Sequence, residues 1–293
     1  QVSRFLYNVN DEILLVGEGN CSFSRALVEK FEVGDKITCT TYDTYDVLKT
    51  KYGDEVDGFI QQLIDSNARV QHGIDATKLH EAKKLARSGE ETAVFDTIVF
   101  NFPHTGAGIK NTERNILANQ EMLTNFFESA YKVLSEKGEI HLTIKLGEPY
   151  SQWRVAKLAE RATDLYLKNS QPFDCTLYPG YEHRRTIGFD EGKSKAGNHD
   201  IEKGARTYVF VRDTERRIQE QKVKDHPRNK KRERKDSRVQ AKKRTHHDDD
   251  SSDDGESGDK GGEGDDRQDN DIHKQSNAFE KVKFTKLEMN GLM

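Results

Sequence analysis

The chain has 293 residues, of which 33% are hydrophobic and 33% are charged, and its formal net charge is −4. A composition this polar leaves too little apolar surface for two full hydrophobic cores, and it predicts a long disordered segment. No apolar run approaches the length of a membrane span, and residues 1–12 lack the layout of a secretion signal, so we expect a soluble protein with no membrane partner.

The first half of the chain alternates apolar runs with helical patterns, which is typical of a parallel sheet covered on both faces. Residues 13–16 form a continuous apolar run that predicts a buried strand, and the run ends at a glycine turn. A helical pattern follows over 23–31, with Asn20 or Ser22 as its N-cap. The next predicted elements are a strand over 37–42, a long helical pattern over 56–64, a strand over 69–72 and a helix over 79–86.

The second half repeats this alternation and ends in a strand. The predicted elements are a strand over 95–100, a helix over 116–134 that stops near Gly138, a strand over 140–144, a helix over 153–162, a less regular stretch over 165–188 and a strand over 205–211. The sequence therefore predicts an α/β domain over residues 1–211, with a mostly parallel sheet and helices on both faces.

Periodicity stops after this domain, and two blocks of opposite charge follow. Residues 212–247 are rich in Lys and Arg, residues 248–276 are mostly acidic, and residues 277–293 regain a few apolar side chains. We expect all three segments to be disordered, although the last could also bind a partner. The small net charge is thus the sum of a basic block and an acidic block. The basic segment predicts nucleic-acid binding, and the alternative is a solvated linker.

A glycine loop, Gly17-Glu18-Gly19-Asn20, lies where the first strand turns into the first helix. Open α/β sheets bind their ligands at this place, and glycines let the backbone approach a cofactor closely. A tight strand-to-helix turn also favours glycine for structural reasons alone. A dinucleotide-binding fingerprint would have its third glycine at Ser22, so the sequence disfavours a nicotinamide-dependent oxidoreductase.

Acidic residues follow the next two predicted strands. Asp43 could accept hydrogen bonds from two ribose hydroxyls, or it could be a turn residue or helix cap. Asp75 could accept a hydrogen bond from an adenine amino group, or it could be the N-cap of the helix that follows. Three strands that each end in Gly or Asp at one sheet edge favour a nucleoside-binding cradle more strongly than any one of them does.

The fourth strand ends in Asn101-Phe102-Pro103-His104. An Asn before an aromatic residue and a proline can present its side-chain carbonyl and a backbone carbonyl to a planar nitrogen, while Phe102 can stack on a base. This pattern is suited to methyl transfer to a ring or exocyclic nitrogen. The alternative is an ordinary Pro-containing loop capped by Asn101.

Three segments together resemble a known family, the eukaryotic nucleolar large-subunit ribosomal RNA (uridine-N3)-methyltransferases. They are Leu14–Ser24 (LLVGEGNCSFS), Asn101–Gly106 (NFPHTG) and Tyr178–Thr186 (YPGYEHRRT). The resemblance covers about residues 10–211 and implies a Rossmann-like class I methyltransferase sheet, of a kind also found in proteins with a ferredoxin-fold anticodon-binding domain. It implies S-adenosylmethionine as methyl donor, uridine N3 as acceptor and ribosomal RNA as partner. Cys21 stands where a Phe is expected, which is a small departure.

Such a reaction needs a base, because uridine N3 carries a proton at neutral pH. His104 is the first candidate and His183 the second, although either could be a loop histidine without a catalytic role. Tyr181, His183, Arg184 and Arg185 alternate aromatic and cationic groups, which predicts RNA contacts, while an ordinary surface strand could show the same mix. The competing hypothesis is a non-catalytic RNA-binding or ribosome-assembly factor that keeps the fold.

The remaining expectations concern the setting of the protein. Three widely spaced cysteines, Cys21, Cys39 and Cys175, form no CxxC pair, which favours a reducing compartment and predicts no bound metal. The basic segment could serve as a nuclear or nucleolar address, with the cytoplasm as the alternative location. We expect the protein to be a monomer.

Overall fold

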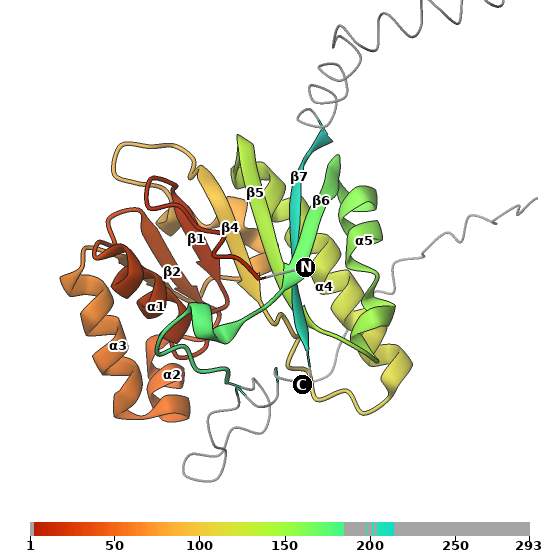
Figure 1. The fold of residues 1–293 in the computed structure, drawn as a ribbon, viewed down its shortest axis with the longest axis horizontal. Coiled ribbons are helices and arrows are strands. Elements are labelled where there is room, and N and C mark those ends of the chain that lie inside the picture. Colours follow the sequence, from red (N-terminus) through yellow and green to blue (C-terminus); the bar gives the residue numbers. More distant parts are fainter. Residues whose placement is uncertain (1–2, 185–197, 199–200, 202–203, 214–293) are drawn as a thin grey trace, which may run out of the picture. The chain divides into compact units, whose positions relative to one another are not determined.

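The computed structural model describes residues 3–184, 198, 201 and 204–213. Its core is a seven-stranded sheet in the order β3-β2-β1-β4-β5-β7-β6 (Figure 1). Strand β7 runs antiparallel to both of its neighbours, and the other neighbouring strands are parallel. The strands are β1 Ile13–Val16, β2 Ile37–Thr41, β3 Arg69–His72, β4 Phe95–Asn101, β5 Leu134–Lys145, β6 Leu165–Pro172 and β7 Ala205–Arg212. The prediction of a Rossmann-like, mostly parallel sheet is confirmed.

Helices cover the sheet and connect its strands (Figure 1). The α-helices are α1 Ser22–Phe31, α2 Tyr45–Tyr52, α3 Asp54–Asp65, α4 Thr112–Val133 and α5 Val155–Ala162. The 3-10 segments are η1 Ala76–Glu81, η2 Lys83–Leu85, η3 Tyr150–Trp153 and η4 Cys175–Leu177. None of the described helices is long and apolar enough to cross a membrane.

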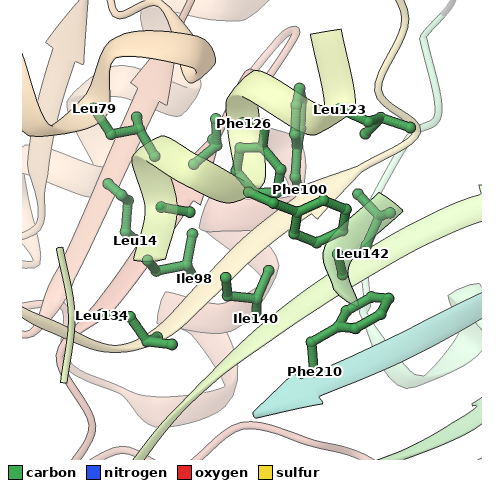
Figure 2. Packing of buried hydrophobic residues seen from close by; sticks show 14 of the residues in the cluster. Leu14, Leu79, Ile98, Phe100, Leu123, Phe126, Leu134, Ile140, Leu142 and Phe210 are labelled. Atoms are coloured by element: carbon green, nitrogen blue, oxygen red, sulfur yellow. The ribbon is translucent and has the colours of Figure 1, made fainter. Parts of the chain in front are cut away.

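Two hydrophobic clusters hold the helices to the sheet, one on each face. Because side chains alternate along a strand, Leu14 and Val16 belong to one cluster and Ile13 and Leu15 to the other. The first cluster packs β4, β5 and β7 against α4, with Phe126 at its centre (Figure 2). Each fully buried large apolar side chain stabilises the fold by about 1.5–3 kcal/mol. Burial on both faces fixes β1, and with it the turn at its carboxyl end.

Four elements differ from the sequence prediction. The helix predicted over 56–64 lies within α3, but a separate helix, α2, precedes it, and Gly53, with a φ of 64°, divides the two. The segment predicted as a helix over 79–86 forms η1 and η2 instead. Helix α4 ends at Val133 because β5 begins at the next residue and pairs there with Phe95. Gly138 lies within β5, where a Cβ atom would come 2.6 Å from Leu134 Cδ1. The stretch after 165 contains strand β6, whose polar composition hid it.

Several predicted segments lie outside the described residues. They are Arg185 and residues 214–293, which hold nearly all of the basic block, the acidic block and the C-terminal segment. The expectations for these residues therefore stay predictions.

Candidate active site

The glycine loop forms the first wall of a pocket at the carboxyl edge of the sheet. Gly17 follows β1 with a φ of +65°, and a Cβ atom there would lie 2.8 Å from Phe100 Cε2. Only glycine therefore fits without moving the phenylalanine ring or straining the backbone. The Glu18 backbone N–H donates to the Thr40 carbonyl oxygen at 2.8 Å, which ties the loop to β2.

The Glu18 carboxylate is anchored beneath this loop. One of its oxygens accepts hydrogen bonds from the Ser24 backbone N–H at 3.1 Å and from Ser24 Oγ at 3.3 Å. Burial raises the pKa of Glu18 from 4.5 to about 7, because desolvation penalises the charged form more than the bonds from Ser24 stabilise it. The pocket thus contains a carboxyl group that changes charge near neutral pH.

The second wall comes from the end of β4. Phe102 has a φ of 52°, an uncommon conformation for a residue with a side chain, which costs of order 1–3 kcal/mol. Its N–H donates to the Thr143 carbonyl oxygen at 2.7 Å, which holds the turn in place. Just before it, the amide nitrogen and oxygen of Asn101 are both buried and have no hydrogen-bond partner among the described residues. A buried unpaired amide is costly, so Asn101 is poised for an external partner.

The third wall is a segment that we name the strap, residues 178–184. Ser22 Oγ donates to the Glu182 carbonyl oxygen at 3.2 Å and accepts from the Glu182 N–H at 3.1 Å. The guanidinium of Arg184 donates to Glu55 at 2.8 Å and to Glu182 at 2.6 Å. Asn20 Nδ2 in the glycine loop donates to the same Glu55 at 2.7 Å. These bonds fasten the strap over the glycine loop.

The three walls enclose a cavity of about 60 Å³, whereas ligand pockets for small molecules typically measure about 300–1,000 Å³. The closed strap therefore leaves room for only a small part of a nucleoside-sized ligand. The cavity is lined by Gly17, Glu18, Gly19, Asn20, Ser22, Tyr52, Asn101, Phe102, Tyr181, Glu182, His183 and Arg184. Most residues singled out from the sequence are thus brought together.

The two acidic residues of the predicted cradle lie at the expected strand ends but outside this cavity. Asp43 forms an ion pair with Lys51 at 2.6 Å. Asp75 accepts hydrogen bonds from Thr77 N at 2.9 Å and Thr77 Oγ1 at 2.8 Å, so it is an N-cap, as the alternative interpretation has it. The Gly73 N–H donates to the Asp43 carbonyl oxygen at 3.2 Å, which joins the two strand ends.

The two candidate bases are placed differently. His104 follows the buried Pro103 and does not line the cavity, and its Nδ1 accepts a hydrogen bond from the Gly106 N–H at 3.0 Å. A neutral ring bonded in this way carries its proton on Nε2. Burial, and secondly the charge of Lys145, lower the pKa of His104. His183 lines the cavity, and its ring lies 4.5 Å from that of Phe102. The geometry therefore favours His183 over His104.

The predicted RNA-binding residues of the strap are less accessible than expected. Tyr181 is 8% exposed, with its ring centroid 5.3 Å from that of Phe23, so it packs in the core instead of presenting a face to a base. The Arg184 side chain is 10% exposed and engaged by Glu55. Ser22 and Glu55, which fasten the strap, were not predicted as site residues. No local pattern marks them, since 160 residues separate Ser22 from its partner Glu182.

Comparison with known proteins gives a matching family model and several similar proteins. The model of the BMT5-like family, described as rRNA (uridine-N3-)-methyltransferase BTM5-like, matches residues 14–185. The 25S rRNA (uridine(2634)-N(3))-methyltransferase of Saccharomyces cerevisiae is 30% identical, over 70% of this chain and 73% of the yeast protein. Heavy metal-associated isoprenylated plant protein 41 of Arabidopsis thaliana is 35% identical, over 62% of this chain.

The chain spans 34% of the length of this Arabidopsis thaliana protein. Among solved structures, NSun6 from Pyrococcus horikoshii matches with a TM-score of 0.44 and 15% identity, over 69% of this chain and 48% of the archaeal one.

Proposed function

The chain belongs to the BMT5-like family of rRNA (uridine-N3-)-methyltransferases, and we propose that it transfers a methyl group from S-adenosylmethionine to N3 of a uridine in large-subunit ribosomal RNA. One observation carries the proposal. The unpartnered amide of Asn101 lines the same cavity as the glycine loop. A substrate base bound to Asn101 would therefore lie next to a cofactor bound to the loop. A ribosomal RNA substrate also favours a nuclear or nucleolar location.

The residues at the sheet edge fit the methyl donor. The left-handed turn at Gly17 keeps the strand end clear of side chains, as close approach of a ligand to backbone requires. Asp43 would accept hydrogen bonds from the ribose, and Asp75 would lie beside the adenine. When bound, S-adenosylmethionine supplies an electrophilic methyl group on a sulfonium. Because the closed cavity measures only about 60 Å³, we infer that the strap moves away when the donor enters.

Asn101 is well suited to orient a uracil ring. Its Nδ2 can donate to a uracil carbonyl oxygen, which fixes the ring and leaves the adjacent N3 open to the base and to the methyl group. Phe102 provides a ring on which the base can stack, beside His183. Holding the nitrogen in line with the methyl group lowers the barrier by reducing the entropy lost in reaching the transition state.

The proton on N3 must leave before or during the transfer. We propose His183 as the group that accepts it, because this histidine lines the cavity beside Phe102. His104 is the second candidate, since its Nδ1 already accepts a bond from Gly106 and its low pKa makes it a weaker base.

The test compares Asn101→Ala with the wild type, using labelled S-adenosylmethionine and large-subunit ribosomal RNA. We expect methyl transfer to fall by at least about 100-fold, while calorimetry shows unchanged donor binding. Asn169→Ala, an exposed amide on β6, is the matched control. A wild-type protein that binds donor and RNA without transferring the label would instead support the non-catalytic factor.

A further inference from the structure

A second hollow lies at the carboxyl end of β5, beside the start of α5. We name it the β5–α5 groove, and its volume is about 330 Å³. It is lined by Ile144, Lys145, Leu146, Gly147, Tyr150, Ser151, Arg154, Val155, Ala156, Lys157 and Tyr208. The lining combines three cations, two tyrosines and an apolar floor, and it includes no Asp or Glu.

Two of the three cations carry the positive charge that the groove offers to a ligand. Arg154 and Lys157 are exposed, and neither forms a salt bridge within the described part of the chain. The acidic residues nearest in sequence are Glu148 and Glu160. The Glu148 carboxylate accepts hydrogen bonds from Ser151 Oγ and, at 2.7 Å, from Gln152 Nε2. Glu160 follows Lys157 by three residues on α5 and forms no salt bridge with it in the described part of the chain. Uncompensated cations at a concave surface attract anions.

The start of α5 adds to this field. Arg154 precedes the helix in a left-handed conformation with a φ of 51°, and no side chain caps the first turn. The first amide N–H groups of a helix have no acceptor within it, and they carry a partial positive charge that favours phosphate oxygens. Lys157 lies in the same turn, so backbone and side-chain donors border one groove.

Another hollow of similar volume shows that size alone does not make a surface available to anions. It measures about 390 Å³ and includes Glu12, Arg69 and Arg87. There Arg69 donates to the carbonyl oxygens of Leu85 at 3.0 Å and Lys84 at 2.8 Å. Arg87 is paired with Glu12 at 2.6 Å. Its arginines are already engaged by the protein, whereas Arg154 and Lys157 are available to a ligand.

The groove borders the loop after β4 that leads to the candidate active site. In the sheet, Asn101 pairs with Thr143, and Lys145 comes two residues later on the same strand. The His104 ring lies 6.3 Å from that of Trp153, the last residue of η3, which also contributes Tyr150 to the groove. The groove and the pocket therefore lie at the carboxyl ends of neighbouring strands, β5 and β4.

We propose that the β5–α5 groove binds the phosphodiester backbone of the substrate RNA and directs the strand toward Asn101. Arg154, Lys157 and the first turn of α5 contact phosphates, and the groove contributes affinity without reading base sequence. This inference rests on the proposed function for the identity of the RNA, but it concerns residues outside the candidate active site.

The experiment measures binding of a fluorescein-labelled single-stranded oligouridylate by anisotropy over a range of salt concentrations. The variant is Arg154→Ala/Lys157→Ala in the full chain. We expect its Kd to rise about tenfold at moderate salt, and the slope of log affinity against log salt to fall by about 1.4, or 0.7 for each lost phosphate contact. The matched control is Lys137→Ala/Arg161→Ala, which removes two exposed cations from the opposite ends of the same strand and helix.

The outcomes separate this proposal from the proposed function. Unchanged RNA affinity and slope in the groove variant would overturn it, as would wild-type protein that does not bind the probe. An equal loss of affinity for polyglutamate would mean that the groove takes acidic polypeptides, which also overturns it. Calorimetry with S-adenosylmethionine tests the methyltransferase separately: a variant that binds RNA poorly and the donor normally supports both, whereas RNA loss in a protein that never binds the donor supports the groove alone.

Discussion

The candidate active site and the β5–α5 groove lie along one edge of the sheet, yet they are built in opposite ways. The pocket is small, about 60 Å³, and the strap is hydrogen-bonded to Ser22 at the start of α1 and to Glu55 of α3. The groove is larger, about 330 Å³, and its exposed cations Arg154 and Lys157 have no ion pair among the described residues. Catalysis requires side chains in fixed positions, whereas binding a charged polymer requires only an accessible surface of opposite charge. The two sites lie at the ends of neighbouring strands.

The most damaging change to the pocket should be Gly17→Ala. The added methyl group meets Phe100 Cε2 at 2.8 Å, and the φ of +65° is unfavourable for alanine. We expect a loss of about 2–4 kcal/mol in the free energy of unfolding, measured by chemical denaturation, together with loss of donor binding.

Gly58→Ala is the matched control for that variant. Gly58 lies in the interior of α3, where a Cβ atom meets nothing within 4 Å. Alanine there should stabilise the protein by about 0.5–1 kcal/mol. If Gly17→Ala were as well tolerated, the close packing of the glycine loop against β4 would not contribute to stability. The contrast between a rigid pocket and an open groove would then be wrong.

A second test uses the buried carboxyl of the pocket, Glu18. It ionises near 4.5 in the unfolded chain, but burial raises its pKa to about 7 in the folded protein. Between these values only the folded state holds the proton, so the free energy of unfolding falls as pH rises from about 4.5 to 7 and stays lower above. Glu18→Gln removes this penalty and keeps an oxygen that can accept from Ser24.

We expect Glu18→Gln to be more stable than the wild type by about 1–3 kcal/mol at pH 8, with the difference nearly gone at pH 4. Denaturation at both pH values measures it. Glu136→Gln, an exposed carboxyl at the amino end of β5, should show no such pH-dependent gain. A Glu18 variant that is less stable at pH 8 would mean that the charged carboxylate supports the loop.

The same comparison explains how far the sequence could lead. Strands β1 and β4 and the loops after them were predictable because buried strands appear as continuous apolar runs, and ligand-binding loops follow them, whereas the polar strand β6 gave no such pattern. The burial of Tyr181 was not predictable, since an alternation of aromatic and basic residues looks alike on a surface and on a segment packed in the core. The groove left no signal either, because Lys145, Arg154 and Lys157 are spread over a strand end and a helix start, and only the fold gathers them.

The smallest expected effect concerns the strap, and it tests whether the pocket must open. Arg184→Ala removes the bonds to Glu55 and Glu182, which are partly exposed and together contribute about 1 kcal/mol. If the strap has to move before the methyl donor binds, the association rate of S-adenosylmethionine should rise about fivefold, as measured by stopped-flow fluorescence.

The Arg161→Ala variant, which changes an arginine at the far end of α5, should leave that rate unchanged. Slower association in Arg184→Ala would mean that the strap helps to form the donor site instead of closing it. Because Arg184 lies away from the groove residues, RNA affinity should stay within about twofold of the wild type in either case. A large loss of RNA affinity would instead show that the strap and the groove act on the RNA together, and the division between a fixed pocket and a charged groove would have to be abandoned.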